Sequence, residues 1–424
     1  MILPNVSNHE LVSHHGLACN DGRSSRVLRG VVAAFAVCAS LVAPAWAQVG
    51  GQTPVKIGVV GPFTGSTAEF GVPMLNGIQL AVDEINAVGG YLGRPLELVI
   101  KDDGGNPDQG RKVSQELLAS KVVAVLGFCN TGVALKAMDL FQDAQVPLIV
   151  PCASGTPVTA KYPAPESYVF RVQARDALMA PFMVDDILKR GWDKVAVFAD
   201  KTGYGDGGLK DVVAALAAKN VKPVHVARFD LGVKDLTAEL EAARSAGAEV
   251  IYSFTLGPEN VVIAQGRKAL GWKVPQVGTW PLSSPSFLES AKDASEGVLM
   301  VQTFIADPSN ERRAAFLSGY SRKFQGRVTV PMAAANAYDA TYLLMYSFLG
   351  IRNGSLSGKA IKESLEGKMK TYYGVVATYD KPFSSQDKDA ITQNMLYIGK
   401  VKNGQVTFAY PEDAKRNLFV QRKQ

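Results

Sequence analysis

The chain has 424 residues, a formal net charge of +6, four cysteines and four histidines. This length suggests two domains, because a single domain usually has roughly 100–200 residues. The basic residues are spread along the chain without a run, whereas nucleic-acid binding needs a clustered basic face. The composition therefore argues against a nucleic-acid partner.

Residues 26–47, RVLRGVVAAFAVCASLVAPAWA, have the pattern of a secretory signal peptide. Two arginines precede an apolar run, and Ala45-Trp46-Ala47 forms an A-x-A cleavage site. The apolar run is shorter than the ~20 residues that a membrane span needs. We therefore expect export and cleavage before Gln48, with residues 1–25 as an upstream extension and a soluble mature protein.

Cleavage would leave 377 residues with a net charge of +5, two cysteines and one histidine. Cys129 and Cys152 would be able to form a disulfide in an exported protein, although two free thiols fit the sequence equally well. His225 is expected at an exposed position on a strand. A Ser-His-Asp or Cys-His hydrolase would depend on that one histidine, so we expect no enzymatic activity, no metal and no cofactor.

Apolar periodicity predicts alternating strands and helices with short loops, which is typical of a parallel, doubly wound α/β sheet. The first unit is predicted to have strands 55–60, 96–101, 122–127 and 147–151, and helices 73–88, 108–120 and 133–143. The second is predicted to have strands 194–199, 224–229, 250–254 and 276–279, and helices 207–219, 236–246 and 261–270. The C-terminal third is predicted to complete both units with helices 310–324, 333–349 and 361–365 and a hairpin through Asn403-Gly404.

Four loops follow predicted strands, where an open parallel sheet binds its ligands. They are residues 61–71, 127–132, 151–156 and 200–207, and they combine glycines, hydroxyls and aromatic side chains. Hydroxyls and free N–H groups at a helix N-terminus suit a carboxylate, although Thr131 and Ser154 could instead simply cap the helices after them. The Lys-Ser/Thr pair of a phosphate loop and a G-x-S-x-G elbow are both missing.

These loops and their flanks resemble the periplasmic substrate-binding proteins of ABC transporters, in the leucine/isoleucine/valine-binding branch. The resemblance covers essentially the whole mature chain and is carried by VKIGVVGPFTGSTAEFG, NGIQLAVDEINAVGG, LELVIKDDGGNPDQG, IVPCASGTPVT, SYVFRV, VAVFADKTGYGDGG and NAYDATYLLM. It implies a type I periplasmic-binding-protein fold, in which two lobes close over a solute by hinge bending. It also implies a periplasmic monomer that delivers this solute to the permease subunits of an inner-membrane transporter.

The implied lobes are residues 48–171 with 303–378 and residues 172–302 with 379–424, and the third crossing is left open between Thr378 and Asn394. Thr131 and Ser154 match positions that bind an amino-acid carboxylate, which is a strong charge-assisted contact. The resemblance further assigns the Ala153 carbonyl to the ammonium and two aromatic side chains, Phe70 and Tyr204, to packing on the ligand.

One feature of the family is missing. Amino-acid binders place a glutamate after the strand that here ends at Thr279, to hold the ammonium, but this chain continues with Trp280-Pro281-Leu282. A buried ammonium without a carboxylate is costly. The possible substitutes are Asp176, Asp200 and Glu259.

Alternatively the ligand has no ammonium, and Trp280 offers an aromatic face to an aromatic or other organic acid, unless it only packs in the core. A ligand-sensing regulatory protein on the same fold is a further alternative, which the signal segment disfavours.

Overall fold

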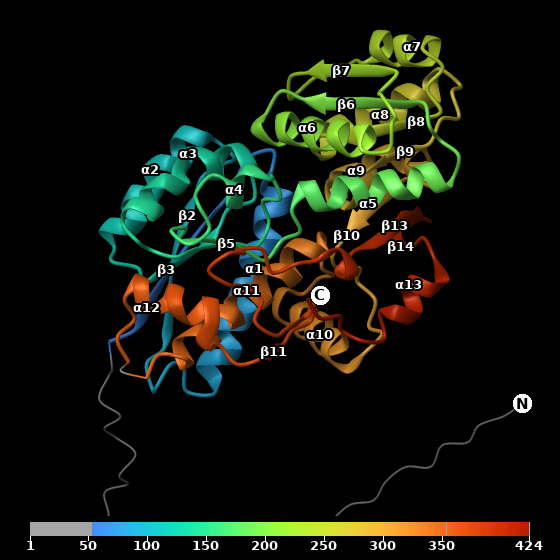
Figure 1. Ribbon diagram of the computed structural model, residues 1–424. Helices are drawn as coiled ribbons and strands as arrows, with labels where there is room; N and C mark the ends of the chain where they lie inside the picture. Colours follow the sequence, from blue (N-terminus) through green and yellow to red (C-terminus); the bar gives the residue numbers. More distant parts are fainter. Residues whose placement is uncertain (1–52, 353, 424) are drawn as a thin grey trace, which may run out of the picture. The chain divides into compact units, whose positions relative to one another are not determined.

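The computed structural model describes residues 53–352 and 354–423, which form two large, mainly parallel sheets, a small two-stranded sheet and the helices around them (Figure 1). The predicted signal peptide lies outside these residues. Within them, no helix combines the length and the apolar character needed to cross a membrane.

The first sheet has five parallel strands in the order β2-β1-β3-β4-β5. Its strands are β1 (Val55–Gly61), β2 (Leu96–Asp102), β3 (Ala124–Gly127), β4 (Leu148–Val150) and β5 (Val169–Arg171). Ile57 and Val59 belong to the core shared with α1 (Ala68–Ala87) and α11 (Pro331–Leu349), and Val60 to the core shared with α2 (Pro107–Ala119) and α3 (Thr131–Asp143). Both faces are covered, which is why these strands are apolar almost throughout.

The second sheet has the order β14-β13-β10-β9-β8-β6-β7. Its strands are β6 (Val195–Asp200), β7 (His225–Phe229), β8 (Val250–Phe254), β9 (Gln276–Gly278), β10 (Leu299–Gln302), β13 (Tyr397–Lys402) and β14 (Gln405–Phe408). The first five are parallel, and the hairpin of β13 and β14 adds to β10 antiparallel. Helices α5 (Asp176–Lys189) and α6 (Gly203–Ala217) pack together on one face, and α7 (Thr237–Ser245) and α8 (Gly257–Ala269) lie on the other.

The remaining helices, helical turns and short strands surround the two sheets. They are α4 (Pro157–Ala160), η1 (Trp280–Ser283), α9 (Pro285–Ala291), η2 (Lys292–Ser295), α10 (Glu311–Phe324), α12 (Gly358–Glu363), η3 (Ser364–Lys368), β11 (Tyr372–Tyr373), β12 (Thr378–Tyr379), η4 (Gln393–Met395) and α13 (Pro411–Arg416). The segment around Asp389 runs parallel to β5. The backbone amide of Arg171 donates to the Lys388 carbonyl, and the Arg171 carbonyl accepts from the Ala390 amide. The connection from this segment to the second sheet therefore lies between Ala390 and Tyr397.

The α/β class with parallel sheets is confirmed, and most predicted strands agree with the structure to within one or two residues. Three helices begin four or five residues earlier than predicted, namely α1 at Ala68, α6 at Gly203 and α8 at Gly257. The sequence prediction omitted β5, α5 and β10, which lie where the chain passes between the two sheets.

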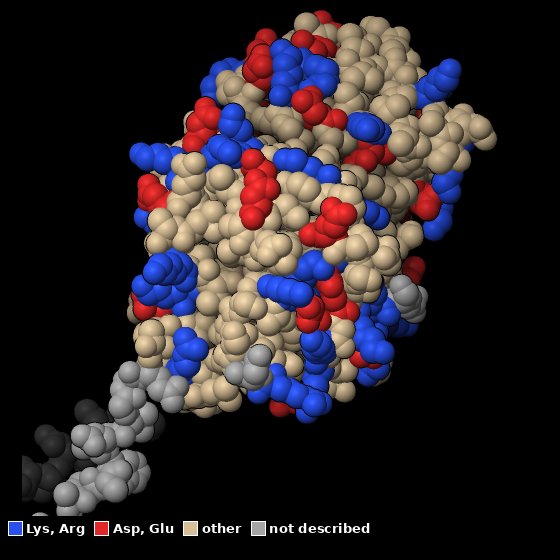
Figure 2. Space-filling view, turned by 60° about the vertical axis from the view of Figure 1, so that its left-hand side comes forward, with Lys and Arg blue, Asp and Glu red and all other residues tan. Residues whose placement is uncertain are grey.

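The predicted exposed position of His225 is wrong. The residue lies in β7, but its side chain is half-buried beside Phe198, and it is the neighbouring Val226 that is exposed. On the face shown in Figure 2, basic and acidic side chains are interspersed over short distances.

Candidate ligand-binding site

Loops at the carboxyl ends of both sheets hold the six residues predicted to bind the ligand. Phe70 lies in the first turn of α1, Thr131 begins α3, and Ala153 and Ser154 follow β4. From the second sheet, Tyr204 lies in the first turn of α6 and Trp280 begins η1. All six side chains are buried, with exposures between 0% and 6%.

Thr131 and Ser154 do not cap the helices that follow them. Thr131 is already helical, and its Oγ1 accepts from the Gly155 amide at 3.2 Å. Ser154 Oγ accepts from Trp280 Nε1 at 3.2 Å, and Thr156 occupies the N-cap of α4. The simple capping explanation therefore fails for both hydroxyls, since Thr131 faces the Ser154 loop and Ser154 faces Trp280.

Trp280 joins the loops of the two sheets. Besides its bond to Ser154, its ring meets the Phe70 ring edge-on, with centroids 5.0 Å apart. Tyr204 is fixed beside it, because its hydroxyl lies 2.5 Å from Thr279 Oγ1. Its ring also packs against Phe254, with centroids 4.8 Å apart. Of the three predicted aromatic side chains, Trp280 thus reaches the Ser154 hydroxyl, and Phe70 packs against its ring.

The loops after β3 and β4 are covalently joined. Cys129 and Cys152 form a disulfide with a Cα–Cα distance of 4.6 Å, so the structure decides between the bonded and free states that the sequence left open. The bond connects the loop that ends at Thr131 to the loop that contains Ser154 and so restricts their separation.

A buried guanidinium supports the same region. Arg171 is fully buried and donates to the carbonyls of Ser154 and Gly155 at 2.9 and 2.7 Å. It also forms an ion pair with Asp389 at 2.7 Å. Burial raises the pKa of Asp389, but the charge and hydrogen bond of Arg171, with smaller effects of Arg175 and Thr159, together outweigh it and the pKa is lowered. Arg171 therefore positions the Ser154 loop against the segment that leads to the second sheet.

Of the three acids considered as substitutes for the missing glutamate, two already have partners. Asp200 Oδ1 accepts from the Thr202 amide and hydroxyl at 2.9 and 2.6 Å and so holds the loop after β6. Glu259 Oε1 accepts from the Gly232 amide at 2.7 Å.

Asp176 differs from both. It is fully buried at the start of α5, and neither carboxyl oxygen makes a hydrogen bond of ordinary geometry with the described residues. Its amide donates to the Ser154 carbonyl at 2.9 Å, which places it beside the hydroxyl pair. Burial raises the pKa of Asp176 to about 7, against the opposing effects of Ser154 and Arg171.

Tyr252 is a second unpaired group at this place, and the sequence analysis missed it. Its hydroxyl is buried without a hydrogen-bond partner among the described residues. Burial raises the pKa of Tyr252 well above its ordinary value, and the charges of Asp176 and Asp211 raise it further. The only signal in the sequence is a tyrosine within the buried strand β8.

The strand-end loops of the two helix-covered sheets meet around hydroxyl, carboxyl and aromatic side chains. This arrangement defines a two-lobed solute-binding protein. The chain belongs to the periplasmic binding protein family, whose model matches residues 54–405. It is similar to the Leu/Ile/Val-binding protein homolog 3 of Brucella melitensis, with 32% identity over 267 residues, which cover 63% of this chain and 70% of that protein.

Solved structures agree with this assignment. The branched-chain amino acid transporter substrate-binding protein LivJ of Streptococcus pneumoniae, solved with isoleucine, has a TM-score of 0.73 and 25% identity, and covers 84% of this chain and 98% of its own. A solute-binding protein of Rhodopseudomonas palustris, solved with benzoate, also has a TM-score of 0.73 but only 19% identity, over 84% and 95% of the two chains. The second likeness shows the fold alone.

Proposed function

We propose that the protein is a periplasmic receptor that captures an α-amino acid, with a branched-chain side chain or a related one, and presents it to an ABC importer. The unpaired, fully buried carboxyl of Asp176 beside Ser154 carries this proposal. A buried carboxyl without a partner is costly, and an ammonium group is the partner that would compensate it. The names of the relatives and the isoleucine complex of LivJ support the same substrate class.

The two ends of the amino acid have different partners. The hydroxyls of Thr131 and Ser154 bind its carboxylate, which accepts strong charge-assisted hydrogen bonds. Asp176 and the Ala153 carbonyl bind its ammonium. Phe70, Tyr204 and Trp280 pack on the side chain from the two lobes.

In this assignment Trp280 must release Ser154. The indole Nε1 now donates to Ser154 Oγ at 3.2 Å, so the hydroxyl oxygen accepts there and its hydrogen can be donated to a ligand carboxylate. A small rotation of the indole would admit the ligand while its ring keeps covering Phe70. No catalytic step is part of the proposal, which describes binding, lobe closure and delivery by an exported monomer.

An aromatic or other organic acid is the second candidate. Trp280 next to Phe70 offers an aromatic enclosure, and a fold relative was solved with benzoate. With such a ligand Asp176 would remain protonated, as its pKa of about 7 allows, and would donate a hydrogen bond.

The two candidates differ in the sign of their pH dependence. Calorimetric titration of leucine and of benzoate between pH 5.5 and 8.5 separates them. An amino acid needs ionised Asp176, so its affinity should fall as the pH is lowered, whereas the affinity for an organic acid should rise. Asp176→Asn should weaken leucine binding at least 10-fold and leave benzoate binding unchanged or stronger.

Thr131→Ala and Ser154→Ala should each weaken either ligand, because both candidates have a carboxylate. Ser167→Ala is a matched control, since Ser167 is buried but lies away from the strand-end loops and bonds only within its own turn. Unchanged affinity in both hydroxyl variants would refute the carboxylate assignment, and leucine binding that is indifferent to Asp176→Asn would refute the ammonium assignment.

A further inference from the structure

A cavity of about 500 Å³ lies away from the six residues of the strand-end site, none of which lines it. Its walls come from three parts of the chain: η1 and α9 with the β13–β14 hairpin, the segment that continues β10, and α10 with the segment before α11. A volume of this size is within the range of ~300–1,000 Å³ in which proteins bind small molecules.

Gln302 is the most informative residue of the cavity. Its side chain is 1% exposed and lines the cavity, yet neither its amide nitrogen nor its amide oxygen has a hydrogen-bond partner among the described residues. A buried amide without partners costs free energy. A hydrogen-bond acceptor on a bound molecule would satisfy the amide nitrogen.

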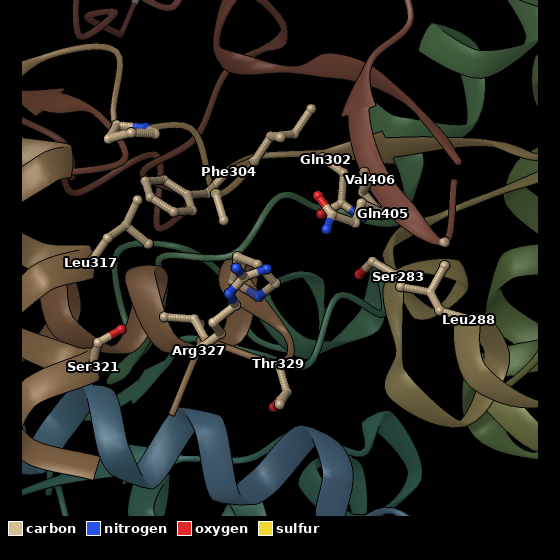
Figure 3. A pocket seen from close by; sticks show the side chains of 16 residues that line it. Ser283, Leu288, Gln302, Phe304, Leu317, Ser321, Arg327, Thr329, Gln405 and Val406 are labelled. Carbon is tan, nitrogen blue, oxygen red and sulfur yellow. The ribbon is translucent and has the colours of Figure 1, made fainter. Parts of the chain in front are cut away.

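The charge of the cavity indicates what that group is. Arg327 lines it and forms no ion pair with any described residue, and none of its sixteen lining residues is acidic. Figure 3 shows the Arg327 side chain extending into the cavity, with Gln302, Gln405 and Val406 on the opposite wall. An arginine opposite a free amide suits a carboxylate, which accepts hydrogen bonds from both.

The remaining lining is largely apolar. Phe304 and Leu317 lie on one side of the cavity and Leu288 on the other (Figure 3). Such walls bury an aliphatic or aromatic body, and the few polar groups orient it.

We propose that this cavity is a second binding site, for an organic monocarboxylate with an apolar body, and that it is distinct from the strand-end site. Arg327 and Gln302 bind the carboxylate, and Phe304, Leu317 and Leu288 enclose the rest of the molecule. Ser283 also lines the cavity and donates to the Trp280 carbonyl at 2.7 Å, so η1 is shared by the two sites.

Octanoate is a suitable probe, with octanamide as its uncharged counterpart. Calorimetry on the mature chain should show one equivalent of octanoate bound in the presence of saturating leucine, and at least 10-fold weaker binding of octanamide. Arg327→Gln should weaken octanoate binding at least 10-fold. Arg322→Gln, at an exposed arginine that does not line the cavity, should leave it unchanged.

Gln302→Leu should also weaken octanoate binding while the protein remains folded, since it removes an unpaired buried amide. Absence of octanoate binding would overturn the proposal. A second result would also overturn it. If the double variant Thr131→Ala/Ser154→Ala abolished octanoate binding and Arg327→Gln did not, the probe would occupy the strand-end site. The effect of Arg327→Gln on octanoate binding does not depend on whether leucine is the ligand of the strand-end site. A failure of this proposal can therefore be distinguished from a failure of the proposed function.

Discussion

At the scale of single residues, Asp176 and Asp339 show that burial alone does not define a binding group. Both carboxyls are fully buried, and burial raises the pKa of Asp176 to about 7 and that of Asp339 to about 6. Asp339 accepts from two backbone amides and two tyrosine hydroxyls, so it is a structural acceptor. Asp176 has no such donors, which is why we assign it to a ligand.

This difference predicts opposite effects on stability. The pKa of Asp176 is higher in the folded chain than its ordinary value of 3.8, so its favourable contribution is present below that value and is lost as the pH rises through about 7. In the absence of ligand, Asp176→Asn should therefore gain stability relative to the unmodified protein as the pH rises from 5 to about 7, by about 3 kcal/mol at most.

Thermal unfolding at several pH values measures this gain. Asp339→Asn is the matched control and should be destabilised at pH 7, because its four donors lose a charged acceptor. A stability difference for Asp176→Asn that stays constant across this pH range would contradict the assignment of the raised pKa.

At the scale of elements, glycines in the first turns of helices are required by close packing. Sequence patterns treated them as loop residues, and α1, α6 and α8 were therefore predicted to begin four or five residues late. A Cβ on Gly71 would lie 2.0 Å from the Pro62 carbonyl oxygen, and one on Gly205 would lie 2.1 Å from the Asp200 carbonyl oxygen. These helices begin directly against the preceding strand ends, and only glycine allows that approach.

Two glycines of α6 provide a matched test. Gly205→Ala should destabilise the protein by about 1–3 kcal/mol, as overpacking usually does. Gly207→Ala should be neutral or stabilising by up to about 1 kcal/mol, because the nearest atom to its Cβ would be 4.0 Å away and alanine favours a helix. Urea unfolding measures both, and equal effects would show that helix propensity, not packing, decides these positions.

At the scale of the whole molecule, Glu69 connects the two lobes. It lies in the first turn of α1, and its carboxylate accepts from the amide and hydroxyl of Ser286 in α9, at 3.0 and 2.7 Å. Burial raises the pKa of Glu69, although the Ser286 bonds oppose this. A Cβ on Gly257 would lie 2.6 Å from Glu69 Oε1, so α8 leaves room for this contact.

Glu69→Gln should therefore favour the open arrangement of the lobes. Hydrogen bonds to a charged group contribute about 1.5–3 kcal/mol when buried. For this half-buried carboxylate we expect about 1 kcal/mol, or a roughly 5-fold faster ligand dissociation.

Stopped-flow dissociation and small-angle scattering measure the rate and the closure. Ser286→Ala should have a similar effect alone and little further effect in the Glu69→Gln background. Fully additive effects would show that the two residues do not act through one contact.

The α/β class and the strand-end loops were predicted from the chain alone, because they follow from local periodicity. Thr131 and Ser154 were proposed from the hydroxyls of those loops, whereas Phe70, Ala153 and Tyr204 were assigned through the family resemblance. Trp280 was singled out as well, but its partners Phe70 and Ser154 lie more than 120 residues away in sequence. Such contacts leave no local pattern, and the sequence prediction also missed α5 and β10, which belong to the second sheet and its helices.

The sequence by itself determined that this is a two-unit α/β protein with hydroxyl-bearing loops, since each strand and helix records its own burial in its own residues. Only the tertiary structure decided which acid is left without a partner, which cysteines are bonded and which helices begin against a strand end. The physical reason is that hydrogen-bond satisfaction and close packing depend on groups from distant segments. Asp200 and Glu259 accept hydrogen bonds of ordinary geometry from described residues, whereas neither carboxyl oxygen of Asp176 does.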